Sequence, residues 1–526
     1  MTRAAICLLG ISVLAFGQTG RFDVLITGAK VIDGSGGPWF YGDVGIKGDT
    51  IAAVGLLPDA TAAVRVDARG LAVAPGFIDI HSHGRRGIFT VPTAENYLRE
   101  GVTTIIEGPD GSSPLPLAPF LERVAKTPVS INFATFVGQG TIRQQVIGLA
   151  NRKATPDEIG KMKELAAQAM RDGAFGLSTG LFYVPGNYTP TEEVIELAKV
   201  VGRMGGIHIS HMREEAAHVL DSVRETIRIG QEGGLPTQIT HHKIIGKQNW
   251  GQSVESLKLV EEARARGVDV TIDQYPYTAS STGISALFPQ WALEGGQRSL
   301  QERLSAPDQR ARIKATIVDN ITFDRGGGDP KNIAIANCGF DRGLAGKNLA
   351  EITQARGVQP TIDNAAESAI ELQLKGGCSA VYHAISEDDV VRILRSPYTM
   401  IASDGEIPVF GQAAPHPRSY GTFARVLGVY VREKHVLTLE EAVRRMSGYP
   451  AQRLKIWDRG LLRPGMKADV VVFDPRTIAD RATYERPHQY SAGVRDVLVN
   501  GRFVLRDEQV TADRPGRVLY GPAHRD

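Results

Sequence analysis

The stretch Pro75-Gly-Phe-Ile-Asp-Ile-His-Ser-His83 determines how the rest of the chain is interpreted. Residues 77–80 form a short, mainly apolar run that is typical of a buried β-strand, and a Pro-Gly pair marks its start. Side chains alternate along a strand, so His81 and His83 point to the same side. Two polar residues can simply end a strand, but two imidazoles placed in this way also suit a metal ion.

Composition and charge restrict the kinds of partner. The chain has 526 residues, of which 42% are hydrophobic, and this is ample for a large core with an added domain. Lys and Arg number 60 against 58 Asp and Glu, which gives a formal charge of +2. This near balance gives no support for binding to nucleic acid or to an acidic membrane surface.

The N-terminus is typical of an export signal over residues 1–17. A positive charge at Arg3 is followed by a nearly unbroken apolar run over residues 4–16, and small residues surround the predicted cleavage position. The alternative is a buried first helix, but the run is short and has no amphipathic face. We therefore expect an exported, periplasmic or extracellular protein. An oxidising compartment would allow Cys338 and Cys378 to pair, although their spacing does not require it.

Both ends of the mature chain are rich in alternating strand patterns. Residues 22–74 contain several such runs separated by glycine turns, and residues 459–520 repeat this texture with an Asn500-Gly501 hairpin signal. The alternating strand pattern at both ends predicts one small β-sandwich domain that is built from both termini.

No stretch after the predicted export signal has the roughly 18 uninterrupted apolar residues of a membrane-spanning helix.

The middle of the chain, residues 75–458, alternates strand and helix patterns, which predicts an α/β fold of the (β/α)8 barrel type. The eight predicted strands are Phe77–Ile80, Thr103–Glu107, Ile131–Val137, Phe175–Leu177, Ile207–Ser210, Pro236–Thr240, Asp269–Asp273 and Thr399–Ser403. Residues 284–350 interrupt the rhythm between strands seven and eight. We interpret them as an inserted subdomain or lid, against the simpler alternative of a surface excursion with no role.

Residues of the metal-binding type recur where the predicted strands end. These residues are His81, His83, Glu107, Asp110, His211, His241 and Asp404. Catalytic groups of a (β/α)8 barrel lie at the carboxyl ends of its strands, so the pattern favours a hydrolytic metal site over a histidine-rich structural core. Imidazoles and a carboxylate can bind zinc and leave a position for water. Asp404, which could otherwise be a helix cap or loop residue, is the candidate for proton transfer to the departing nitrogen.

Several segments resemble the N-acyl-D-amino-acid deacylases, the D-aminoacylases of the amidohydrolase superfamily. They are Pro75–His83, His211-Met-Arg-Glu214, Thr240-His-His-Lys243, Tyr275-Pro-Tyr-Thr-Ala-Ser-Ser281, Ser403-Asp-Gly405 and His416-Pro-Arg-Ser-Tyr-Gly-Thr-Phe423. The resemblance covers residues 22–505. It implies a barrel, one or two zinc ions, a small-molecule substrate, and hydrolysis of the amide bond of an N-acyl-D-amino acid.

The resemblance also assigns roles to individual residues. It implies His81, His83, His211 and His241 as metal ligands and Asp404 as the catalytic residue. The candidates for substrate binding are Tyr183, Lys243, Tyr275, Ser280, Ser281 and Arg418. The family commonly has a cysteine ligand in a Gly-Asn-Cys-Gly loop, but here Asp110 stands at that position. A carboxylate is a harder ligand that can bridge two ions, so the metal count stays open, and Glu107 remains a competing ligand.

Two other functions are considered. A related amidohydrolase acting on D-amino-acid dipeptides or cyclic amides would usually have a metal-bridging lysine after strand four, where this chain has Leu177-Ser-Thr-Gly180. A non-catalytic binding protein on the same scaffold is disfavoured because Asp404 and the four histidines are all present. The preferred side chain and acyl group, and the oligomeric state, do not follow from the sequence.

Overall fold

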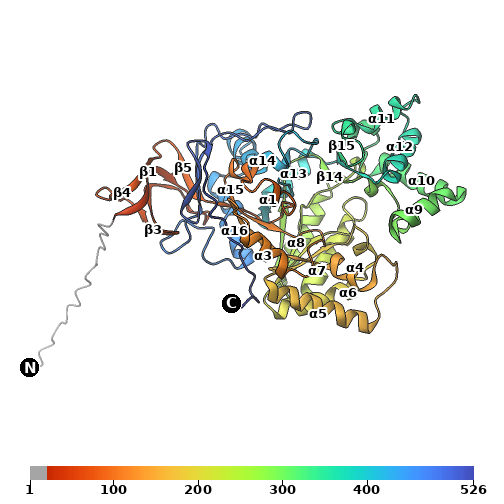
Figure 1. Cartoon of the computed structure of the whole chain (residues 1–526), viewed down its shortest axis with the longest axis horizontal. Helices are drawn as coiled ribbons and strands as arrows, with labels where there is room; N and C mark the ends of the chain where they lie inside the picture. The colour runs from red at the N-terminus through yellow and green to blue at the C-terminus, as the bar shows by residue number, and fades with distance from the viewer. Residues whose placement is uncertain (1–20, 526) are drawn as a thin grey trace, which may run out of the picture.

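The computed structural model describes residues 21–525, so the predicted export signal lies outside the described residues. The predicted (β/α)8 barrel is confirmed (Figure 1). Its strands are β6 (Phe77–Asp79), β7 (Val102–Glu107), β8 (Asn132–Thr135), β9 (Val137–Gly138), β10 (Gly176–Gly180), β11 (Ile207–His211), β12 (Thr237–Ile239), β13 (Val270–Gln274) and β17 (Thr399–Ile401). Strands β8 and β9 together form the third of the eight barrel strands, which is interrupted at Phe136. Neighbouring strands within the barrel pair in parallel.

The barrel wall consists of two hydrogen-bonded sheets that meet twice. One sheet has the order β6-β7-β8 and the other runs from β9 through β10, β11, β12 and β13 to β17. They meet at Phe136, between β8 and β9, and at an isolated parallel bridge between Ser82 and Gly405. Beside that bridge, the Asp404 N–H donates to the carbonyl of His81 at 2.9 Å. The ends of the first and last strands are therefore joined directly at the mouth.

Helices cover the outside of the barrel. The main ones are α3 (Ala118–Lys126), α5 (Pro156–Asp172), α6 (Thr191–Arg203), α7 (Val219–Gly233), α8 (Ser253–Ala265), α13 (Glu387–Arg395) and α15 (Leu439–Met446). Helix α5 begins with a capping box in which Thr155 and Glu158 satisfy each other's backbone N–H groups. The helical pattern of residues 214–232 predicts a helix from Glu214, but α7 begins five residues later, because the Glu214 carboxylate accepts the N–H groups of Ala216 and His218 and holds a loop there.

Both termini build one nine-stranded sheet at one end of the molecule (Figure 1). The N-terminal strands are β1 (Phe22–Val31), β2 (Phe40–Lys47), β3 (Thr50–Gly55), β4 (Ala62–Asp67) and β5 (Ala72–Pro75), and the C-terminal strands are β18 (Val470–Phe473), β19 (Val494–Val499), β20 (Arg502–Arg506) and β21 (Gln509–Val510). The two sets join where β5 pairs antiparallel with β18. Buried aliphatic side chains from both sets share one cluster, which ties the ends together.

The last residues of the chain leave this sheet. The predicted sheet domain extends to residue 520, but residues 516–521 run along the barrel instead. The Phe133 N–H donates to Arg517 O at 2.9 Å, and the Leu519 N–H donates to Phe133 O at 2.8 Å. Strand β8 pairs with β7 along one edge, whereas β10 pairs with β9, so the tail forms hydrogen bonds with the other edge of β8.

The insertion lies at the opposite end of the molecule and is larger than predicted (Figure 1). It contains β14 (Ser280–Gly283), α9 (Gly296–Ser305), α10 (Pro307–Phe323), β15 (Ile333–Cys338), α11 (Leu349–Ala355), α12 (Ile362–Leu374) and β16 (Cys378–Tyr382). It therefore continues past the predicted limit of residue 350, because β16 pairs with both β14 and β15 and closes a core of its own. Cys338 and Cys378 form a disulfide between β15 and β16. Within residues 21–525, no helix combines the length and apolar character needed to cross a membrane.

Candidate active site

Asp110 stands on a tight loop after β7 that two neighbours fix in place. Gly108, Asp110 and Gly111 all have positive φ, at 78°, 55° and 72°. The Ser178 hydroxyl donates to Gly108 O at 2.6 Å and accepts the Gly111 N–H at 3.1 Å. A Cβ at Gly180 would lie 2.1 Å from Asp110 O, so only glycine fits there. A non-glycine residue in the left-handed region costs free energy, which is typical of a functional position.

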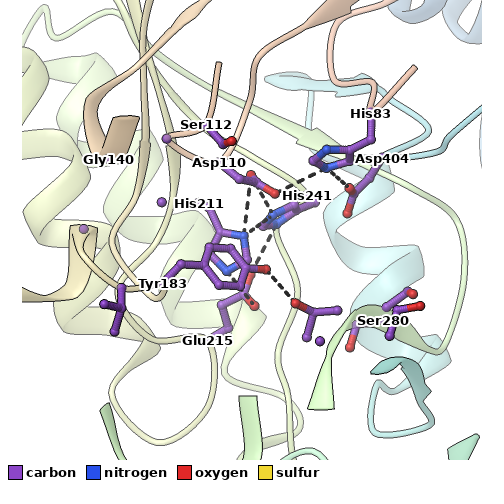
Figure 2. Close-up of a pocket in the computed structure, with 18 of the residues that line it drawn as sticks. His83, Asp110, Ser112, Gly140, Tyr183, His211, Glu215, His241, Ser280 and Asp404 are labelled. Atoms are coloured by element: carbon purple, nitrogen blue, oxygen red, sulfur yellow. Dashed lines mark hydrogen bonds and ion pairs between the residues drawn. The ribbon is translucent and has the colours of Figure 1, made fainter. Parts of the chain in front are cut away.

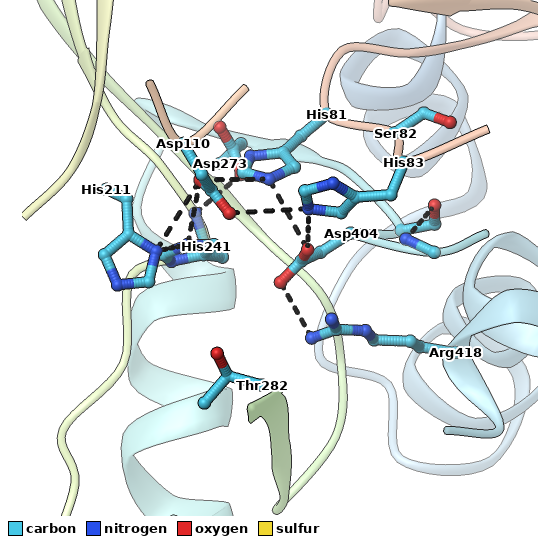
Figure 3. Close-up of polar contacts among 12 residues, drawn as sticks. His81, Ser82, His83, Asp110, His211, His241, Asp273, Thr282, Asp404 and Arg418 are labelled. Atoms are coloured by element: carbon cyan, nitrogen blue, oxygen red, sulfur yellow. Dashed lines mark hydrogen bonds and ion pairs between the residues drawn. The ribbon is translucent and has the colours of Figure 1, made fainter. Parts of the chain in front are cut away.

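One group of metal-type ligands contains His81, His83, Asp110 and Asp404 (Figure 3). The Nε2 atom of His81 lies 3.5 Å from an oxygen of each aspartate. The Nε2 atom of His83 lies 3.0 Å from Asp404 Oδ1 and 3.4 Å from Asp110 Oδ2. Both imidazoles therefore face the two carboxylates, as the alternation along the first strand predicts.

A second group adds two histidines from β11 and the end of β12 to the same Asp110. His211 Nδ1 and His241 Nε2 lie 2.7 Å apart, and each lies 3.6 Å from Asp110 Oδ1. Burial would raise the pKa of Asp110, but His81 and His211 hold it well below its usual range. An ionised Asp110 is therefore shared by both groups.

These residues fit a metal by their chemistry and by their unmet hydrogen bonds. Both ring nitrogens of His81 and the Oδ1 atom of Asp110 are buried without a hydrogen-bond partner. Buried polar atoms rarely remain unpaired, so a missing partner is expected here. Each group combines two imidazoles with at least one carboxylate, which is a nitrogen and oxygen donor set that zinc accepts.

Glu107, the competing candidate, faces another way. Its Oε2 atom accepts the Arg85 backbone N–H at 2.9 Å, and its Oε1 atom lies 3.7 Å from Arg85 Nε. Neither of the two groups formed among the described residues contains it. This geometry favours Asp110 as the ligand after the second strand.

Glu215 is a site residue that the sequence analysis missed. Its Oε1 atom lies 3.2 Å from His241 Nδ1, and its Oε2 atom lies 3.8 Å from His211 Nε2, so it backs both histidines. Burial would raise its pKa, but Lys243 and the two histidines hold it well below the usual range. A carboxylate behind a ligating imidazole fixes the ring and its tautomer. The available signal was the second glutamate of His211-Met-Arg-Glu-Glu215, in a stretch that was predicted as helix.

Lys243 is engaged with this network. Its ammonium donates to Glu215 Oε1 at 2.5 Å and to the His241 carbonyl at 2.9 Å, and it lies 2.8 Å from His241 Nδ1. Lys243 lines the pocket, but its ammonium group is engaged with Glu215 and His241 of the protein itself. Its predicted role in binding the substrate is the one that the geometry supports least.

Asp404 stands between Arg418 and the two histidines of the first group, His81 and His83 (Figure 3). Arg418 Nη1 lies 2.7 Å from Asp404 Oδ2, although the two groups are not aligned for a hydrogen bond. Burial would raise the pKa of Asp404, but Arg418 and His81 hold it well below its usual range. The carboxylate is therefore ionised.

The predicted residues surround one cavity of 410 Å³ (Figure 2). Those lining it are His83, Asp110, Tyr183, His211, His241, Lys243, Tyr275, Ser280, Ser281, Asp404 and Arg418. His81 is buried behind this wall, at 0% exposure. Tyr183 and Glu215 lie on one side of the view, with His83 and Asp404 on the other. The Tyr183 hydroxyl and the Thr282 hydroxyl share a hydrogen bond of 3.1 Å.

Comparisons with known proteins agree with this geometry. The model of the amidohydrolase family matches residues 65–505. The chain belongs to the amidohydrolase family. It is 39% identical to a D-aminoacylase of Alcaligenes xylosoxydans xylosoxydans, over 95% of this chain and 97% of the relative. The predicted membership of the D-aminoacylase branch is thereby confirmed.

Two solved structures share the fold over 95% of this chain and the whole of theirs. One is a D-aminoacylase described as having a binuclear metal centre, with a TM-score of 0.81 and 36% identity. The other is an N-acyl-D-glutamate deacylase of Bordetella bronchiseptica in complex with zinc and a phosphonate inhibitor, with a TM-score of 0.81 and 35% identity. Together with the His and Asp cluster, this makes the chain a metal-dependent hydrolase.

Proposed function

We propose that this protein hydrolyses the amide bond of N-acyl-D-amino acids and releases a carboxylate and a free D-amino acid. The observation that carries the proposal is the position of Asp404. Its carboxylate lies 3.0 Å from His83 Nε2 and 2.7 Å from Arg418 Nη1. A proton acceptor therefore stands between a metal-type cluster and a guanidinium that can bind a carboxylate. The similarity to D-aminoacylases supports the choice of substrate.

The residues divide the reaction between them. A bound zinc ion would supply an acidified water and polarise the amide carbonyl. Asp404 takes up a proton from the attacking water and returns it to the departing nitrogen. Arg418 presents two parallel N–H donors to the α-carboxylate. Glu215 orients His211 and His241, so that a nitrogen of each faces Asp110.

Zinc is the metal we assign, with positions for two ions that share Asp110. His211 and His241 would hold one ion, and His81 and His83 the other. The donor set of imidazoles with a carboxylate supports zinc. The zinc complex of the D-glutamate deacylase and the binuclear centre of the D-aminoacylase are consistent with this assignment.

A substrate screen with and without chelator tests the function. N-acetyl-D-amino acids should release amine faster than their L-enantiomers by a wide margin. Removal of the metal should abolish turnover, and added zinc should restore it, with metal per chain measured by elemental analysis. Full activity in a metal-free sample would contradict the metal site. Equal or faster rates on L-enantiomers would contradict the stereochemical assignment.

We also propose that the protein is exported. The charged and apolar pattern of residues 1–17 supports this. The disulfide between Cys338 and Cys378 gives further support, because such bonds persist mainly in oxidising compartments. Edman sequencing or mass spectrometry of the periplasmic or secreted fraction should find a chain that begins near residue 18.

A further inference from the structure

Two buried arginines differ from the others in the described part of the chain. Arg143, Arg445, Arg453 and Arg459 are buried, and each donates side-chain hydrogen bonds to the protein. Arg325 and Arg418 are buried to a similar degree, at 3% and 6% exposure. Neither of these two guanidiniums donates a hydrogen bond to any residue between 21 and 525, and both line the same cavity. A buried guanidinium has five N–H donors, so its partner is expected to be a ligand.

Arg325 reaches the cavity from the insertion, just after α10. Its guanidinium carbon lies 4.5 Å from the centre of the Phe182 ring. Its Nη2 atom lies 3.7 Å from Glu215 Oε2, which is too long for a hydrogen bond. Glu215 is already paired with Lys243 at 2.5 Å. Arg325 is therefore held in place by stacking and by charge, while its donors remain available.

Many of the other side chains that line the cavity are polar, and Glu406 adds a carboxylate to them. Among the described residues that line it, Val184 and Pro185 carry the only aliphatic side chains. Serine and threonine side chains are abundant, namely Ser112, Thr141, Ser280, Ser281, Thr282 and Ser379. A second carboxylate on the substrate would find hydroxyl groups and a guanidinium here.

Both a D-aminoacylase and an N-acyl-D-glutamate deacylase are similar to this chain, so the preferred side chain has to follow from this cavity. We propose that the enzyme selects substrates with a second carboxylate, and that Arg325 binds this group while Arg418 binds the α-carboxylate. This inference rests on the proposed deacylase function. Asp404 beside Arg418 places the α-carboxylate near the catalytic base, and Arg325 lies against Glu215 at the other side of the cavity. The second carboxylate can belong to the amino-acid side chain or to the acyl group.

The test compares acids with neutral substrates of almost equal size. N-acetyl-D-glutamate and N-acetyl-D-glutamine address the side chain, while N-succinyl-D-alanine and N-succinamoyl-D-alanine address the acyl group. In the wild type, kcat/KM should be higher for at least one acid than for its neutral counterpart. In Arg325→Gln the ratio of kcat/KM for the acid to kcat/KM for its neutral counterpart should fall about 30-fold or more, because loss of one partner of a buried charge pair has at least this cost. Arg325→Lys should retain part of the preference.

The matched control is Arg298→Gln. Arg298 lies in the same insertion, on α9, and pairs with Glu302 while its side chain is 90% exposed. In Arg298→Gln the ratio of kcat/KM for the acid to kcat/KM for the neutral substrate should equal that of the wild type. Metal content and Tm of each variant show that it is folded.

Three outcomes would overturn the inference. The wild type could prefer the neutral substrate of each pair, or Arg325→Gln could leave the ratio of kcat/KM for acid over neutral substrate unchanged. An equal fall of this ratio in Arg298→Gln would also overturn it. If Arg325→Gln does not fold, the ratios of the wild type and of Arg325→Lys decide. A protein that hydrolyses none of the N-acyl-D-amino acids refutes the deacylase function itself. Hydrolysis of neutral substrates without a preference for acids refutes only the role of Arg325.

Discussion

At the scale of single residues, Asp404 and Asp110 share a cluster but have different neighbours. Asp404 contacts His83 and Arg418, whereas Asp110 lies within reach of both histidine pairs. Asp404→Asn keeps the size of the side chain but removes the proton acceptor, so we expect turnover to fall about 10²–10⁴-fold. Zinc should remain bound at His211 and His241, and elemental analysis beside kcat checks both halves of the prediction. Loss of all the metal together with activity would show that Asp404 is mainly a ligand.

Asp110 should show the opposite order of effects. Asp110→Ala removes the carboxylate common to both groups, so metal content should fall first and activity should follow. Added zinc should restore part of the rate, and Asp110→Cys should retain more metal than Asp110→Ala because a thiolate is a competent zinc ligand. Glu107→Ala is the matched control and should keep its metal. If Glu107→Ala loses metal while Asp110→Ala keeps it, the assignment of this loop is wrong.

The candidate site shows which residues a sequence can reveal. Histidines and aspartates at strand ends are recognisable because the barrel fold brings those ends together. Glu215 and Arg325 were missed, since each lies on a loop whose path depends on tertiary packing. Glu215 faces the histidines only because the Glu214 carboxylate holds residues 216 and 218 in a turn.

At the scale of elements, the eight barrel strands were predictable and the limits of the insertion were not. Most of the strands are short runs between turn signals, and several of them end in a metal-type residue, so local pattern is sufficient to find them. The region 349–382 contains two helices and a strand, which look like a further barrel unit in sequence. Their place in the insertion depends on antiparallel pairing of β16 with β14 and β15, a non-local contact that periodicity does not encode.

Backbone strain occurs at the mouth of the barrel, where the strands end. Asp110, His241 and Asp404 each follow a barrel strand, and each has a positive φ, at 55°, 37° and 51°. The backbone turns sharply there, and neighbouring strands hold it. Asp273 Oδ1, for example, accepts the His241 N–H at 2.7 Å. Such positions cost about 1–3 kcal/mol each and persist where surrounding contacts fix them, which favours a preorganised site.

At the scale of the whole molecule, a buried polar network joins the terminal sheet to the barrel. Asp469 Oδ1 accepts the Asn500 backbone N–H at 2.7 Å, and Asp469 Oδ2 accepts from the side-chain amide of Asn132 at 2.9 Å. Arg459 pairs with the same carboxylate. Asn132 belongs to barrel strand β8, while Asp469 precedes β18 of the sheet. One carboxylate therefore satisfies groups from both parts, and all four side chains are buried.

We expect Asp469→Ala to destabilise the whole chain without changing the chemistry. The substitution leaves the buried Arg459 guanidinium without its carboxylate, and breaking a buried pair in this way costs about 3–5 kcal/mol. The network is remote from the metal-type residues, so metal content and kcat of the folded fraction should stay close to those of the wild type. Asp513→Ala is the matched control, because Asp513 pairs with Arg502 on the exposed surface, where such pairs contribute about 0–1 kcal/mol. Thermal and denaturant unfolding should place Asp469→Ala clearly below both the wild type and Asp513→Ala. If Asp469→Ala unfolds together with the control, the sheet is held to the barrel by apolar packing instead.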